Sequence, residues 1–105
     1  MDIFPIKING LIPPKRSGSA GFIHNDNIYI YGGIARNILF ADLWKLNLKT
    51  WKWSLIELKN YPEKRWGHTF NFIKLTAVLF GGRCGSKPQN MGCIYHFDLN
   101  SINKW

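Results

Sequence analysis

The sequence predicts an all-β protein made of about two four-stranded antiparallel units. The first observation is an internal repeat: a shift of 49 residues places segment 13–18 on 62–67, and Gly32-Gly33 on Gly81-Gly82. The second observation is that each double glycine ends a short apolar run, at 28–31 in one copy and 77–80 in the other. A fixed period of this length is typical of proteins in which one small unit stacks on the next.

Four strands are predicted in the first unit, over residues 20–24, 28–31, 43–48 and 51–56. Segment 25–27 (Asn-Asp-Asn) predicts the turn between the first two, because Asn and Asp tolerate left-handed backbone and bond to their own backbone. Gly32-Gly33 predicts a point where the chain needs positive φ or a close backbone approach. Residues 34–40 are predicted to form a loop, and Lys49-Thr50 to begin a turn.

The second unit repeats this order but is shorter by one strand. Its predicted strands are 69–73, 77–80 and 93–99, and Trp105 falls at the position of Trp53. Under the 49-residue shift Phe4 falls on Trp53 and Ile6 on Leu55. Residues 3–9 are therefore predicted to be a fourth strand without the three that precede it. The predicted organisation is therefore an N-terminal strand in 1–10, a first repeat in 11–59 and a second repeat in 60–105 that lacks its last strand.

These residues resemble the kelch repeat, the unit of a class of β-propellers. The resemblance rests on a double glycine after an apolar strand, an aromatic residue in the next strand and a Trp farther on. They are Gly32, Gly33, Trp44 and Trp53 in the first copy, and Gly81, Gly82, Tyr95 and Trp105 in the second. The Pro-x-x-Arg-x-Gly segment with Arg16 or Arg65 is also similar to the family pattern, although Ser19 stands where the second copy has His68.

The resemblance implies that each repeat forms one four-stranded blade of a propeller, and that residues 4–9 could close a ring with the other end of the chain. Closed propellers have typically 4–8 blades, whereas this chain holds about two. Two blades would leave two broad apolar faces open. Three explanations stay open: a piece of a larger propeller, which we favour, an assembly of copies of this chain, or a degenerate remnant.

Composition narrows the class of partner. The chain of 105 residues has 14 Lys and Arg against 6 Asp and Glu, a net charge of +8. The charges are scattered singly rather than clustered, so they favour an acidic protein over nucleic acid. No apolar stretch is long enough for a membrane helix, and the N-terminal residues lack the pattern of a signal peptide, so cytoplasm or nucleus is expected. Cys84 and Cys93, nine residues apart, are expected to be ordinary thiols; the alternative is a disulfide that closes the loop between them.

No constellation predicts catalysis, a metal or a cofactor. The three histidines, His24, His68 and His96, lie far apart in the sequence, and no carboxylate or Cys stands at ligand spacing beside them. The acidic residues are scattered and the glycines do not open a helix, which disfavours a nucleotide loop. We therefore predict a protein that is not an enzyme. The alternative is a fragment of a kelch-propeller enzyme, such as an oxidase or a sugar-acting enzyme. It could equally be part of a multidomain phosphatase or ubiquitin-ligase adaptor, with the functional residues outside this chain.

The loops are the remaining candidates for function. In propellers the connections between strands two and three, and between successive blades, often line a binding face; here they are 34–41, 83–92 and 59–66. Arginine beside an aromatic residue is common in recognition surfaces. The predicted partner-binding residues are Arg36, Arg83, Lys64, Trp66 and Lys87. Arg16 and Arg65 are predicted to brace their own segments instead, and the chain as a whole to be a protein–protein interaction module.

Overall fold

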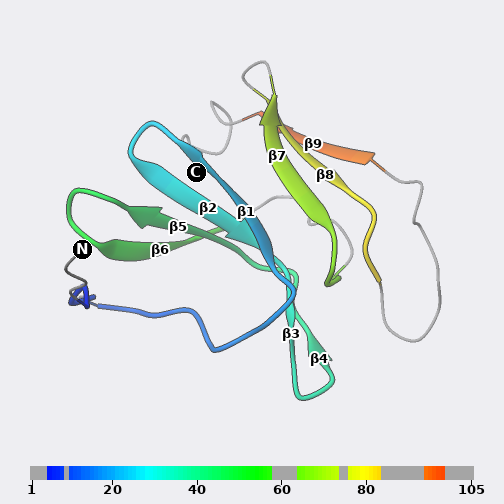
Figure 1. The fold of residues 1–105 in the computed structure, drawn as a ribbon, viewed down its shortest axis with the longest axis horizontal. Coiled ribbons are helices and arrows are strands. Elements are labelled where there is room, and N and C mark those ends of the chain that lie inside the picture. Colours follow the sequence, from blue (N-terminus) through cyan, green and yellow to red (C-terminus); the bar gives the residue numbers. More distant parts are fainter. Residues whose placement is uncertain (1–4, 9, 58–63, 74–75, 84–93, 99–105) are drawn as a thin grey trace.

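The structure, a computed structural model, is all-β, as the sequence predicts. It describes residues 5–8, 10–57, 64–73, 76–83 and 94–98. Within these residues there are nine strands and no helix, arranged as a four-stranded sheet, a three-stranded sheet and a small hairpin (Figure 1). No helix long and apolar enough to cross a membrane is present in the described part of the chain.

The first sheet contains the four predicted strands in the order β1-β2-β5-β6, all antiparallel. They are β1 (Ala20–His24), β2 (Asn27–Tyr31), β5 (Leu43–Asn47) and β6 (Lys52–Ile56). The turn between β1 and β2 places Asn25 and Asp26 at φ of 46° and 61°, the left-handed geometry that these residues tolerate. The N–H of Leu48 donates to the carbonyl of Asp26 at 2.8 Å, which continues this register one residue beyond β5.

The second sheet repeats the first three strands in the order β7-β8-β9. These are β7 (Thr69–Ile73), β8 (Thr76–Phe80) and β9 (Ile94–Asp98), each within one residue of its predicted bounds. The repeat extends to isolated backbone bridges, because Ser17 pairs with Ile34 and, 49 residues on, Trp66 pairs with Arg83. The two units therefore share their lead-in geometry as well as their strand order.

The prediction of a loop over residues 34–40 is wrong. Strands β3 (Ile34–Ala35) and β4 (Ile38–Leu39) form a short antiparallel hairpin that turns at Arg36 and Asn37. Two-residue hairpin turns are recognised in sequence by Asn-Gly or Asp-Gly, and Arg is an uncommon first residue. The strands are also too short to show alternation, so no sequence pattern indicates this hairpin.

The predicted N-terminal strand is not seen in the residues that can be described. Residues 5–8 belong to no strand, and residues 1–4 and 9 lie outside the described ranges. A β-strand forms by hydrogen bonding to a neighbouring strand, and none of the described strands pairs with residues 5–8. Lys87, Trp105, Cys84 and Cys93 also lie outside the described residues.

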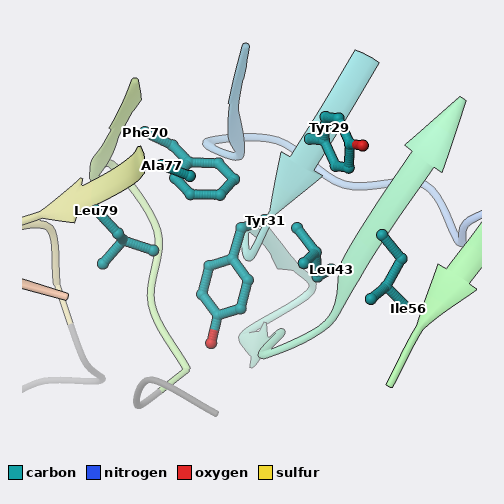
Figure 2. Close-up of a cluster of buried hydrophobic side chains, with 7 residues drawn as sticks. All are labelled: Tyr29, Tyr31, Leu43, Ile56, Phe70, Ala77 and Leu79. Carbon is teal, nitrogen blue, oxygen red and sulfur yellow. The ribbon is translucent and has the colours of Figure 1, made fainter. Parts of the chain in front are cut away.

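The core lies between the two sheets, where β1 meets β7. Figure 2 shows Tyr29, Tyr31, Leu43 and Ile56 of the first sheet facing Phe70, Ala77 and Leu79 of the second. Phe22 completes the contact, with its ring centroid 5.1 Å from that of Tyr29 in a stacked arrangement and 4.8 Å from that of Phe70 at an edge. Burying a large apolar side chain stabilises by about 1.5–3 kcal/mol. This interface therefore holds the two blades together.

The opposite face of the first sheet is covered only in part. Trp44 is buried there against Trp53, with ring centroids 6.4 Å apart and the planes nearly perpendicular. On the same face Ile23 is 67% exposed and Leu55 is 48% exposed. In the repeat Ile23 corresponds to Phe72, which packs against the first sheet. The face of Ile23 is thus built like one that covers another blade.

Candidate functional site

The connections that carry the double glycines gather at one end of both sheets, which we call the double-glycine end: segments 13–18, 32–42, 64–67 and 81–83. Backbone hydrogen bonds join the two blades here. The N–H of Gly33 donates to the carbonyl of Arg65 at 2.8 Å, and that of Gly67 donates to Gly18 at 2.8 Å. The N–H of Arg65 donates to Phe40 at 3.3 Å. These hydrogen bonds hold the loops in one arrangement, so they form a single fixed surface.

The double glycines allow this close approach. Gly32 has φ of 73°, and a Cβ there would lie 2.7 Å from the carbonyl oxygen of Arg65 and 2.8 Å from Cε1 of His68. In the second unit, a Cβ on Gly82 would lie 2.7 Å from the carbonyl oxygen of Trp66. Only glycine fits both the backbone conformation and the space.

Arg16 ties its segment to the first double glycine. Its guanidinium donates to the carbonyl of Gly32 at 3.1 Å and to both carboxylate oxygens of Asp42, and it lies 4.0 Å from the ring centroid of Phe40. Trp44 Nε1 donates to the same carboxylate at 2.8 Å. Burial alone would raise the pKa of Asp42, but the hydrogen bonds from Arg16 and Trp44 and the charge of Arg16 outweigh it and hold that pKa below its usual value.

Arg65 occupies the same position 49 residues later. It is fully buried, donates to the carbonyl of Gly81 at 2.9 Å and lies 5.1 Å from the ring centroid of Tyr95. Both arginines therefore bond inward, to the carbonyl of the first residue of the double glycine in their own unit. Neither offers its guanidinium to solvent as a contact for a partner.

His68 lies in the junction between the blades and is 6% exposed. Its ring stands edge-on to Tyr31, with centroids 5.8 Å apart. Burial is the largest influence on the pKa of His68 and lowers it. The Tyr31 backbone opposes burial in part, and the charge of Arg65 lowers the pKa further. The imidazole is therefore neutral at pH 7. Among the described residues no three His, Cys, Asp or Glu side chains lie close enough together to hold a metal ion.

Two predicted binding residues meet on the surface. Trp66 and Arg83 exchange backbone hydrogen bonds of 3.1 Å and 2.8 Å, so their side chains leave the same face as cross-strand neighbours. Trp66 is half-buried, and Arg83 is exposed. A Cβ on Gly18 would lie 3.1 Å from Cε3 of Trp66, so the indole extends over the neighbouring blade. We call Trp66 and Arg83 the Trp–Arg pair.

The other predicted binding residues are more scattered. Lys64 is exposed two residues before Trp66, whereas Arg36 is exposed at the tip of the β3–β4 hairpin. Sequence reasoning missed Asp42, which fixes Arg16, and Ile38, which the hairpin exposes. Asp42 had no signal of its own, because the residue that precedes the corresponding strand β9 is Cys93, the second unit being two residues longer in this loop. The contact between Arg16 and Asp42 spans 26 residues and could not be predicted from local pattern.

A four-stranded antiparallel sheet, whose first three strands recur in register in a second sheet that packs against it where β1 meets β7, defines this chain as consecutive blades of a β-propeller. Comparison with known families agrees. The profile described as "KLHDC2/KLHL20/DRC7 Kelch-repeats domain" matches residues 1–105, and the chain belongs to this kelch-repeat family.

Individual kelch-domain proteins are also similar to the chain. It is 34% identical over 100 residues to Kelch domain-containing protein 3 of Homo sapiens, which covers 89% of the chain and 26% of that protein. It is 27% identical over 104 residues to Kelch domain-containing protein 10 of Homo sapiens, which covers 95% of the chain and 23% of that protein. The chain thus spans about a quarter of the length of these relatives.

Proposed function

We propose that this chain is a non-catalytic protein-interaction module, and that its double-glycine end binds an acidic protein or peptide. The Trp–Arg pair carries the proposal. Tryptophan and arginine are the residue types that most often dominate binding energy at protein interfaces, and here they are neighbours on a rigid scaffold. Arg16 and Arg65 use their guanidinium groups for hydrogen bonds within the protein. Arg83, in contrast, is exposed beside the indole of Trp66.

Charge at this end supports an acidic partner. The exposed cations among the described residues of the double-glycine end are Lys15, Arg36, Lys64 and Arg83. The Asp42 carboxylate at the same end accepts hydrogen bonds from Arg16 and Trp44, and Glu57 lies exposed just beyond β6. Positive charge distributed around a fixed aromatic residue favours carboxylate-bearing ligands and raises their rate of association.

The rest of the ring belongs to the proposal as well. Each blade needs a neighbour on both faces, and the face of Ile23 and Leu55 is open in the described residues. We propose that further blades in the same polypeptide cover it, or that copies of the chain do so. The partner surface would then combine this double-glycine end with those of the neighbouring blades.

The experiment is quantitative capture from the cells that express the full-length protein. Wild type, Arg83→Glu and Lys49→Glu are compared, because Lys49 is an exposed cation at the opposite end of the sheet and serves as the control. Arg83→Glu should lower the amount of the main partner by at least about tenfold, the loss typical of an interface hot spot. Equal recovery with both variants would overturn the proposal, as would recovery that nuclease treatment abolishes.

A further inference from the structure

The β3–β4 hairpin is built to project. Figure 1 shows it leaving the end of the two sheets, and its four strand residues are closed by the two-residue turn Arg36-Asn37. The base is fixed, because Ile34 exchanges backbone hydrogen bonds of 2.9 Å and 2.8 Å with Ser17, and the N–H of Phe40 donates to Gly33 at 2.9 Å. The hairpin is therefore a rigid protrusion rather than a mobile loop.

The turn carries a residue that its backbone does not favour. Arg36 has φ of 50° and Asn37 has φ of 67°, so both lie in the left-handed region. Asn is common there, but a long side chain such as Arg is strained, and glycine would fit better. A two-residue hairpin turn requires this geometry, as at Asn25 and Asp26, but the fold does not require an arginine there. Strain held at an exposed turn is frequently a mark of function.

The outer face of the hairpin combines this arginine with exposed apolar surface. Ala35 and Ile38 are cross-strand partners on one face, and Ile38 is 62% exposed. Their neighbours Ile34 and Leu39, on the other face, are half-buried. The tip thus presents an isoleucine beside an arginine on a convex, preorganised element, an arrangement that suits insertion into a cavity.

We propose that this hairpin is a docking plug: Ile38 fills an apolar pocket on a folded partner domain, and Arg36 pairs with a carboxylate at the rim of that pocket. The proposal rests on the proposed function and deepens it by naming the partner's surface. A convex tip cannot enclose a linear peptide, so the matching surface is concave. The partner's charge follows from the exposed cations Arg36, Lys64 and Arg83 at this end of the molecule.

Site-specific photo-crosslinking of the full-length protein in its own cells tests this. A benzophenone side chain is placed at position 38, at position 64 and, as a control at the opposite end, at position 25. Crosslinks at 38 and 64 to one protein support the plug, provided that the residue reached from 38 lies in a folded domain. Crosslinks at 64 without 38 would overturn the plug and leave the proposed function standing. Crosslinks at neither position 38 nor position 64, or equally strong crosslinks at the control position 25, would overturn both the plug and the proposed function.

The pairing and the strain are tested by substitution. Arg36→Glu should lower the amount of partner captured by about tenfold or more. Replacing the partner's carboxylate nearest the crosslink with a basic residue should restore binding. Arg36→Gly should raise Tm by about 4 °C, because it relieves strain in a domain of this size, and should still lose binding. Asn25→Gly, at the matching position of the β1–β2 turn, should leave binding unchanged. Retained binding in Arg36→Gly, or lost binding with a lower Tm, would contradict the proposal.

Discussion

At the scale of single residues, two arginines in register perform the same task with different surroundings. Arg16 and Arg65 each donate to the carbonyl of the first residue of the double glycine in their own unit. Arg16 adds the Asp42 carboxylate and the Phe40 ring, and Arg65 adds the Tyr95 ring. The sequence predicted that both arginines brace their own segments rather than contact a partner. It could not predict the ligands, because these come from residues distant in the chain.

Asp42→Asn should destabilise the protein by about 2 kcal/mol, because it removes a charged acceptor from the guanidinium of Arg16, which is almost fully buried. The free energy of unfolding, measured with urea, checks this. Asp26→Asn is the control: it breaks the exposed pair of Asp26 and Lys49, whose atoms are 3.4 Å apart, and should cost less than about 0.5 kcal/mol. Equal losses would show that Asp42 is not structural.

The buried His68 predicts a pH dependence with a definite sign. Its pKa is lowered in the folded protein, so between that value and the unfolded value near 6.5 the unfolded state binds more protons. Stability should therefore be full above about pH 6.5 and fall as pH drops below it. The pKa of Asp42 is also lowered in the folded protein, so its protonation should cause a separate loss of stability below about pH 4.

Urea unfolding at a series of pH values measures both losses. His68→Phe keeps a ring between Tyr31 and Gly32 but cannot titrate, so it should remove the loss that begins near pH 6.5 and leave the lower one. An unchanged profile in this variant would assign the titration to another group.

At the scale of elements, strands were predicted well and contacts between elements were not. Runs of β-branched and aromatic residues bounded by turn residues located the strands of both sheets to within about one residue. The β3–β4 hairpin was missed because its turn is Arg-Asn. The Trp–Arg pair joins residues 17 apart through a single bridge, so the sequence named both residues as candidates without showing that they meet.

Glycine substitutions separate backbone strain from the contact between blades. Gly32 and Gly67 have nearly equal φ, 73° and 71°, but a Cβ on Gly67 would meet nothing within 4 Å. Gly67→Ala should cost about 1 kcal/mol for strain alone. Gly32→Ala should cost about 2 kcal/mol more, because its Cβ would force Arg65 and His68 away. Equal losses of unfolding free energy would mean that the blades adjust freely at this junction.

At the scale of the whole molecule, the two units form one interface and leave an apolar face that needs covering. Ile23 and Leu55 lie exposed on the outer face of the first sheet. A 105-residue chain of two blades should therefore self-associate when it is produced alone. The repeat made this predictable from sequence, whereas the depth of burial of Trp44 on the same face was visible only in the structure.

Ile23→Lys should shift the isolated chain toward monomer in size-exclusion chromatography with light scattering, because it places a charge on the face that makes the contact. Ile38→Lys is the matched control, since Ile38 is similarly exposed but lies on the hairpin, away from that face. A monomeric wild-type chain, or the same shift in both variants, would contradict the assignment of this face as the blade contact.

The most direct test of the central claim, that the double-glycine end is a binding surface for an acidic partner, is the Kd of the purified partner for full-length wild type, Arg83→Glu and Lys49→Glu. The proposal predicts at least a tenfold weaker Kd for Arg83→Glu and a change below about twofold for Lys49→Glu, with affinity falling as salt is raised. Equal Kd values for the two variants would contradict it and move the binding surface away from the Trp–Arg pair.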